Sequence, residues 1–184
     1  MPARPRPSTD GQTGSAPRRP PLYTPAERAR RDATRWTLVQ GLLAPAQFLA
    51  FAVSLALVLR YLATGEGYAA ATASILVKTG FLYVIMITGA IWEKVVFGQW
   101  LFAPAFFWED VFSFGVIALH TAYLWALWTG AAGPSGEMLI ALAAYAAYVV
   151  NAGQFLWKLR LARLDAAAAP ATVSAPARND GVHA

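Results

Sequence analysis

The feature that most constrains this chain is a set of four apolar stretches, each long enough to cross a lipid bilayer as a helix. They lie at about 37–63, 71–92, 111–130 and 138–157. A hydrocarbon core about 30 Å thick needs roughly 20 apolar residues in an α-helix. Because 57% of the 184 residues are hydrophobic and only 14% are charged, a soluble fold could not bury the apolar surface. The sequence therefore predicts an all-α, polytopic membrane protein, a four-transmembrane-helix bundle.

Residues at the two ends of the chain differ in composition from the apolar stretches. Pro, Ser, Gly and Arg dominate residues 1–21, and Ala and Pro dominate residues 165–184. Such segments cannot bury enough apolar surface to offset the entropy lost on ordering. We therefore predict a disordered basic tail at 1–21 and a disordered tail at 165–184, on either side of a transmembrane domain at 22–164. Thr24-Pro25-Ala26-Glu27 has the pattern of a capping box, which predicts a helix start.

The positions of the cations predict how the bundle is oriented. Eight arginines precede the first span, and Lys158, Arg160 and Arg163 follow the fourth, whereas the turn at Gly133 carries no cation. Cations concentrate on the cytoplasmic side of a membrane. We therefore expect a multi-pass protein of the inner (cytoplasmic or intracytoplasmic) membrane with both termini cytoplasmic. The expected contact is membrane lipid and not nucleic acid, because the arginines lie mostly in the tails and not on a folded face.

The segment 93–110, between the second and third spans, is unusual for a connecting loop. It is mostly aromatic and aliphatic, and its charges lie at its two edges: Glu93, Lys94, Glu109 and Asp110. One interpretation is an aromatic belt with a short interfacial helix. Charges kept near a membrane against their solvation cost also indicate a functional site. The segment is therefore the first candidate for chemistry.

His120 is the only histidine outside the tails. It lies eleven residues after Glu109, which returns it to the same helical face about 16 Å deeper. Ser113 and Val116 lie between them on this face, and we expect Ser113 to bond to a carbonyl of its own helix. His120 could be a packing residue, an axial ligand to the metal of a bound macrocycle, or a proton-transfer group.

Other polar residues in the spans give weaker indications. Asn151 and Gln154 share a face of the fourth span, where hydrogen bonding between helices explains them. Lys78 lies about two turns from the outer interface, so we expect its ammonium group to reach that interface and to have no functional role. The chain has no cysteine, which excludes disulfides and thiolate metal sites.

Two long motifs carry a resemblance to a known family. The stretches TGAIWEKVVFG at 88–98 and LFAPAFFWEDVFS at 101–113 resemble the vinyl bacteriochlorophyllide hydratase family of bacteriochlorophyll biosynthesis. The similarity runs from about Tyr23 to Leu159 and leaves out both tails. It implies a hydro-lyase that adds water to the 3-vinyl group of a bacteriochlorophyllide or chlorophyllide, giving the 3-(1-hydroxyethyl) derivative. It also implies no cofactor, since the Mg belongs to the substrate, and makes other enzymes of pigment biosynthesis candidate partners.

On this resemblance, we hypothesise that Glu93 and Glu109 flank the vinyl group, with Asp110 beside them. One carboxyl group would donate a proton and another would activate water, and the sequence does not rank them. His120 could ligate the Mg or orient the water.

The resemblance also gives the residues around the acidic groups a role in holding the pigment. Aromatic rings would stack on the macrocycle, and cations such as Lys94 or Arg35 would meet its propionate. The candidate substrate-binding residues are Lys94, Gln99, Trp100, Phe106, Phe107, Trp108 and Asn151. The alternative from another class is a non-catalytic tetrapyrrole-binding or photosynthetic assembly membrane protein. A gain of one water by the pigment separates the two.

Overall fold

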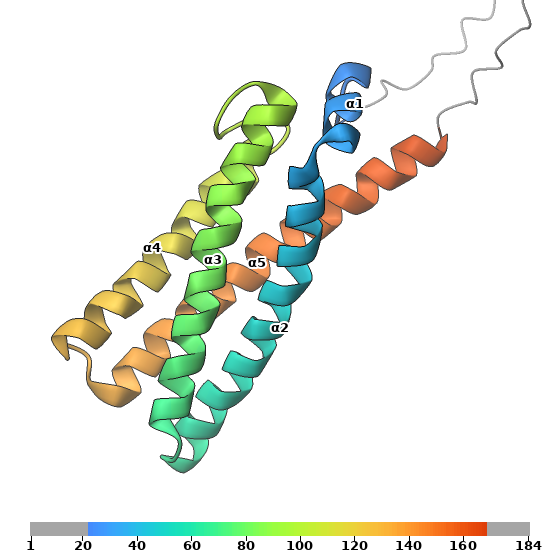
Figure 1. The fold of residues 1–184 in the computed structure, drawn as a ribbon. Helices are drawn as coiled ribbons and strands as arrows, with labels where there is room; N and C mark the ends of the chain where they lie inside the picture. The colour runs from blue at the N-terminus through green and yellow to red at the C-terminus, as the bar shows by residue number, and fades with distance from the viewer. Residues whose placement is uncertain (1–21, 169–184) are drawn as a thin grey trace, which may run out of the picture.

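The computed structural model describes residues 22–168, and this part of the chain is helical, without strands. Its five helices are α1 (Pro25–Ala33), α2 (Arg35–Thr64), α3 (Tyr68–Phe97), α4 (Phe107–Thr129) and α5 (Gly133–Ala168). Figure 1 shows α2 to α5 side by side in one elongated bundle, with α1 and the last turns of α5 at the same end. Four of these described helices are long and apolar enough to cross a membrane. The predicted all-α, four-span architecture is confirmed.

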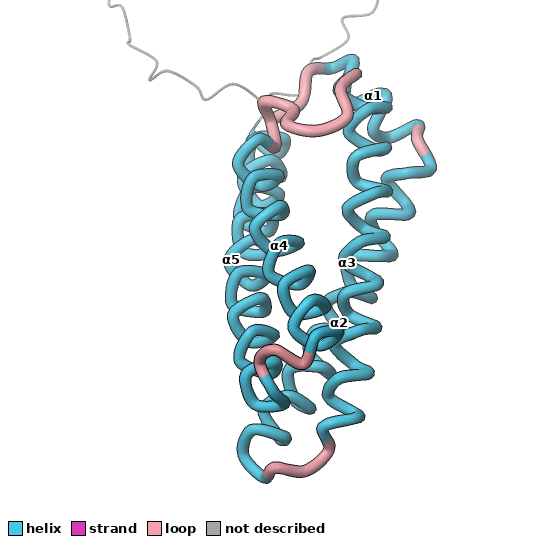
Figure 2. The backbone as a smooth tube through the Cα atoms, turned by 90° about the vertical axis from the view of Figure 1, so that its left-hand side faces the viewer, coloured by secondary structure: helices cyan, strands magenta, loops and turns pink. Residues whose placement is uncertain are grey.

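The bundle consists of two helical hairpins. Short turns join α2 to α3 and α4 to α5, and the partners of each hairpin pack along their length. Gly65 ends α2 in a left-handed conformation (φ 74°), which a residue without Cβ adopts at little cost, and its N–H donates to the carbonyl of Tyr61. The two hairpins contact each other through α2 with α5 and, less extensively, α3 with α4. Figure 2 shows the loop between α3 and α4 crossing from one hairpin to the other.

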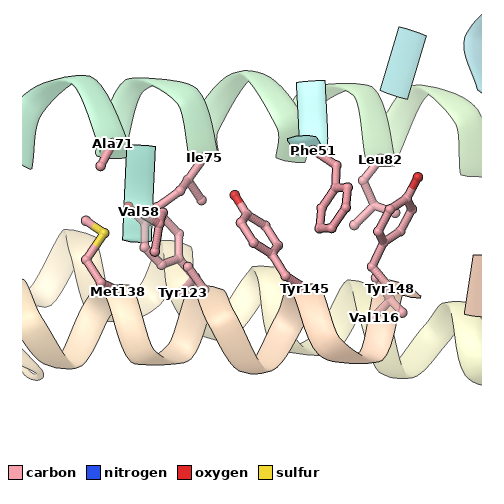
Figure 3. Packing of buried hydrophobic residues seen from close by; sticks show 11 residues of the cluster. Phe51, Val58, Ala71, Ile75, Leu82, Val116, Tyr123, Met138, Tyr145 and Tyr148 are labelled. Atoms are coloured by element: carbon pink, nitrogen blue, oxygen red, sulfur yellow. The ribbon is translucent and has the colours of Figure 1, made fainter. Parts of the chain in front are cut away.

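A hydrophobic core fills the space between the hairpins. Every long helix contributes, with Phe51 and Val58 from α2, Ala71, Ile75 and Leu82 from α3, Val116 and Tyr123 from α4, and Met138, Tyr145 and Tyr148 from α5 (Figure 3). The outward faces carry large apolar side chains such as Leu38, Leu42 and Trp128, which are exposed. In lipid these exposed residues need no protein partner, so the packed core and the outer apolar surface have separate roles.

The helices are longer than the predicted spans, and this changes the segment 93–110. Glu93 lies within the last turns of α3, and Asp110 lies in the first turn of α4. The connecting loop therefore comprises 98–106 only. The sequence interpretation ended the helices at the first charges, but Glu93 and Asp110 are buried and accept hydrogen bonds from the loop, so they need not mark helix ends. The boundary at 165 is also wrong, because α5 continues to Ala168. The remaining predicted tail residues lie outside the described part.

The short helix α1 is attached to the end of α3. The predicted capping box is confirmed, since the Thr24 side chain accepts from the Glu27 N–H and the Glu27 carboxylate accepts from the Thr24 N–H. Nε of Arg30 donates to the carbonyl of Val96 over 2.7 Å. This bond satisfies one of the carbonyls that the last turn of α3 leaves without a helical partner. It places α1 at the end of the bundle that carries Glu93, Glu109 and Asp110, named here the carboxylate end.

Candidate functional site

Two carboxyl groups meet at the carboxylate end. Glu93 of α3 and Asp110 of α4 are each only 5% exposed, and their side chains interact directly. The loop folds over them, so that the N–H of Ala103 donates to Glu93 (3.2 Å) and the N–H of Phe102 donates to Asp110 (2.7 Å). Phe102 has a left-handed backbone (φ 59°), which is uncommon for a residue with a side chain. The pair thus fixes the loop, and two carboxyl groups in contact can also hold a proton between them.

A third acidic residue, Glu109, has a different partner. Its carboxylate lies 2.6 Å from Nζ of Lys158 on α5, and the same ammonium donates to the carbonyl of Ala105. Lys158 also lies over the ring of Phe106, 5.1 Å from its centroid. The structure therefore holds two separate pairs at this end, Glu93 with Asp110 and Glu109 with Lys158.

A groove beside Glu109 gives access to the carboxylate end. It has a volume of about 550 Å³ and lies between α4 and α5 on the outer side of the bundle. It is lined by Trp108, Glu109, Val150, Gly153, Gln154, Trp157, Lys158 and Leu161. Trp108 and Trp157 are exposed by 66% and 67%, so two large aromatic surfaces are available there. Of the three acidic residues at this end, Glu109 is the one that lines the groove.

The remaining predicted binding residues do not gather in one place. Phe106 is buried and packs with Tyr23, Trp92, Phe97 and Phe155. Lys94 donates to the carbonyl of Gly98 and lies near the exposed ring of Trp100, away from the groove lining. Gln99 and Phe107 are exposed on the loop and the start of α4. Within the segment 93–110, the residues that line the groove are Trp108 and Glu109.

Asn151 joins α5 to α4 one helical turn further into the bundle than Glu109. Its side-chain N–H donates to Oγ of Ser113 over 2.8 Å, and both residues are buried. We expected Ser113 to bond to its own helix, but it instead accepts a bond from another helix. The reason is that α5 packs directly against this face of α4. Asn151 and Lys158, seven residues apart, lie on the same side of α5 and reach α4 at successive levels.

His120 lies in the middle of the bundle, on the predicted face of α4. Glu109, Ser113, Val116 and His120 are all buried, which confirms that they share this face. Nδ1 of His120 lies 2.8 Å from the carbonyl of Val116, and Nε2 lies 2.5 Å from Nζ of Lys78. Both ring nitrogens are engaged within the protein. Ligation of a substrate Mg by this imidazole would require Lys78 to move away.

The prediction that the ammonium group of Lys78 reaches the outer interface is wrong. The side chain is completely buried and points to His120, and its ammonium lies 4.5 Å from the ring centroid of Tyr148. Distance from the helix end indicated that Lys78 could reach the interface, but its direction around α3 takes it into the bundle. Lys158 was missed as a site residue, because its partner Glu109 is 49 residues earlier in the sequence. The spacing of Asn151, Gln154 and Lys158 by three and four residues was a sequence signal for a shared face.

Comparison with known proteins gives a consistent result over most of the helical region. Residues 23–161 match a family described as 2-vinyl bacteriochlorophyllide hydratase (BCHF). A protein named 2-vinyl bacteriochlorophyllide hydratase from Cereibacter sphaeroides is 81% identical over 149 residues, which cover 80% of this chain and 92% of that protein. A protein of the same name from Rhodobacter capsulatus is 77% identical over 151 residues, covering 82% and 88%. No solved structure matches the chain.

Proposed function

We propose how this protein adds water to its substrate. The premise is that the chain belongs to the 2-vinyl bacteriochlorophyllide hydratase family. It is a hydratase, a hydro-lyase of bacteriochlorophyll biosynthesis, and its substrate is a bacteriochlorophyllide pigment. The names 2-vinyl and 3-vinyl refer to the same substituent, under two ways of numbering the macrocycle. Adding water across this vinyl group gives a 1-hydroxyethyl group.

The reaction needs an acid and a base near one edge of the pigment. A proton is added to the terminal vinyl carbon, and positive charge develops at the inner carbon, where the macrocycle delocalises it. Water attacks the inner carbon and loses a proton to a base. The step is redox-neutral, so we propose that the protein uses no cofactor and that the Mg is a part of the substrate.

We place the pigment edge in the groove between α4 and α5. A chlorophyllide has a wide apolar ring, and exposed aromatic side chains such as Trp108 and Trp157 offer it stacking surfaces. The groove opens toward the outer apolar surface, from which a pigment dissolved in lipid could enter. This placement is supported by the position of the groove beside Glu109. A surface that serves only for packing does not need an acidic residue.

In this arrangement Glu109 is the general base and touches the attacking water. It forms an ion pair with Lys158, and the carboxylate is the form that a base requires. The acid is supplied from the pair of Glu93 and Asp110, which can hold a proton, and Asp110 follows Glu109 in the chain. Since neither residue of the pair lines the groove, the proton reaches the pigment through an intervening water. The single observation that carries this proposal is that Glu109, already paired with a cation, lines the groove.

Substitution of Glu109 tests the proposal. Glu109→Gln should lower the rate of hydration by about 10²- to 10⁴-fold, the usual contribution of a general acid or base. Glu137→Gln is the matched control, because Glu137 is also buried and accepts a hydrogen bond from Tyr68, but lies at the opposite end of the bundle. The readout is the gain of one water by the vinyl pigment, measured by mass spectrometry. Normal hydration by a well-inserted Glu109→Gln protein would overturn this assignment.

We also propose that the carboxylate end faces the cytoplasm from the inner membrane. Support comes from the cations near it, since α1 and the last turns of α5 both lie at this end and carry arginines (Figure 1). The chain has no cysteine, so single cysteines in place of Gln99 and Ser135 can be labelled cleanly from either side. Labelling of the Ser135 position from the cytoplasmic side would contradict this orientation.

A further inference from the structure

Two amides of α5 have oxygen atoms that the rest of the described chain does not satisfy. Oε1 of Gln154 and Oδ1 of Asn151 are buried and have no hydrogen-bond partner among residues 22–168. The residues lie one turn apart, and Gln154 lines the same groove as Glu109. Buried carbonyl oxygens are normally paired with a donor, so these two atoms indicate a ligand that brings O–H or N–H groups.

The hydrogen bonds that the nearby donors make go to other acceptors. The Lys158 ammonium donates to Glu109 and to the carbonyl of Ala105, and the Asn151 amide N–H donates to Ser113. Lipid chains and the vinyl edge of a chlorophyllide have no O–H or N–H to offer. A hydratase, in contrast, must bind one small donor molecule at its site in every turnover, which is water itself.

We infer that Gln154 is a positioning residue which, together with Glu109, holds the water molecule that is added to the pigment. This inference rests on the proposed function of Glu109. One O–H of the water donates to Oε1 of Gln154 and the other to the Glu109 carboxylate, which leaves a lone pair of the oxygen for the inner vinyl carbon. Oδ1 of Asn151, one turn deeper, accepts from a second water behind the first.

The atoms balance in this step. The water oxygen bonds to the inner vinyl carbon as the vinyl π bond breaks, and Glu109 takes one proton from the water. The terminal carbon gains one proton from the acid, so the product differs from the substrate by one water. Gln154 exchanges no proton, and its effect is on where the oxygen lies and how it points.

Substitution of Gln154 tests this inference, with Gln47 as a matched control. Gln154→Met keeps the size of the side chain and removes the acceptor. It should lower kcat by about 10²-fold with little change in KM for the pigment, since a displaced nucleophile loses its approach geometry. Gln154→Glu keeps an acceptor oxygen and should retain more activity. Gln47 also has a buried oxygen without a partner, but it lies on α2, and Gln47→Met should leave kcat unchanged.

Competition between methanol and water provides a measurement that would not change if Gln154 had only a structural role. Methanol has one O–H and cannot donate to both Gln154 and Glu109, so the unsubstituted protein should select strongly for water. In Gln154→Met the second acceptor is lost, and the ratio of 1-methoxyethyl to 1-hydroxyethyl pigment should rise. If Gln154→Met inserts poorly, the same ratio is measured in Gln154→Glu, which should stay close to the unsubstituted protein.

The outcomes separate this inference from the function on which it rests. Unchanged kcat and an unchanged methanol ratio in Gln154→Met, with Glu109→Gln inactive, would overturn the water site and leave the role of Glu109 intact. Normal activity of Glu109→Gln would overturn both.

Discussion

The carboxylate end and the middle of the bundle both bring buried ionisable side chains of α3 and α4 together, but they differ in access. Glu109 lines a groove, and the neighbouring Glu93 and Asp110 bind the loop 98–106. Lys78 and His120 are enclosed by the core around Tyr145 and Tyr148. Polar groups in a membrane indicate a functional site by default. The comparison teaches that burial and pairing alone do not make a reactive site, and that a route for substrate is also needed.

The middle pair has a structural explanation of its own. Lys78 and His120 bond α3 to α4, which belong to different hairpins and otherwise contact each other little. Ser54 performs a similar function by bonding to Tyr145 of α5 and to Ser74 of α3. Hydrogen bonds of this kind fix how membrane helices are rotated against one another. We therefore expect the middle pair to set the alignment of the hairpins and the carboxylate end to carry the chemistry.

A large effect, comparable to that of Glu109→Gln, should come from the paired carboxyl groups. Glu93→Gln and Asp110→Asn each keep an oxygen that can accept from the loop N–H groups but remove a proton site. If the pair supplies the acid, the hydration rate should fall by about 10²-fold or more in each variant. The measurement is the rate of pigment hydration in membranes with equal amounts of protein. Normal rates would mean that these two residues only anchor the loop.

A smaller effect is expected in the groove. Trp108→Ala should raise KM for the pigment by about 3- to 10-fold, because one stacking surface is lost, while kcat changes less. Trp128→Ala is the matched control, since Trp128 is also an exposed tryptophan of α4 but lies at the opposite end. Equal KM values for the two variants would contradict the placement of the pigment in the groove between α4 and α5.

The smallest effect on catalysis is expected in the middle of the bundle. The double variant Lys78→Met with His120→Phe removes a buried polar pair. Neither partner is left without the other. Such replacements are often neutral or stabilising, whereas the single Lys78→Met leaves Nε2 of His120 without its partner and should lower thermal stability. The hydration rate of the double variant should stay near that of the unsubstituted protein. A strong loss of rate with unchanged thermal stability would assign chemistry to this pair.

The sequence predicts those parts of the structure that depend on nearby residues. Each span appears as a continuous apolar run, the capping box at Thr24 and Glu27 is a local pattern, and the periodicity of α4 places His120 on the face of Glu109. The vinyl hydratase motif is also a contiguous stretch, and the family follows from it. These features need no knowledge of how one helix is turned against another.

Contacts between helices could not be predicted in the same way. Whether Lys78 reaches the interface or the core depends on the rotation of α3, which hydrophobicity around a membrane helix hardly fixes, because both lipid and core are apolar. Because the rotation of each helix was not known, the pairing of Glu109 with Lys158 and that of Glu93 with Asp110 could not be predicted either. The roles hypothesised for Glu93, Glu109 and Asp110 remain predictions, whereas for His120 we now expect a structural role. The substitutions above are designed to test both.

The most direct test compares the two regions in one assay. The rate of hydration of the vinyl pigment is measured in membranes for Glu109→Gln and for the double variant Lys78→Met with His120→Phe, each with confirmed insertion. We predict that Glu109→Gln is nearly inactive and that the double variant hydrates the pigment normally. A normal rate for Glu109→Gln together with an inactive but stable double variant would place the chemistry in the middle of the bundle and contradict this account.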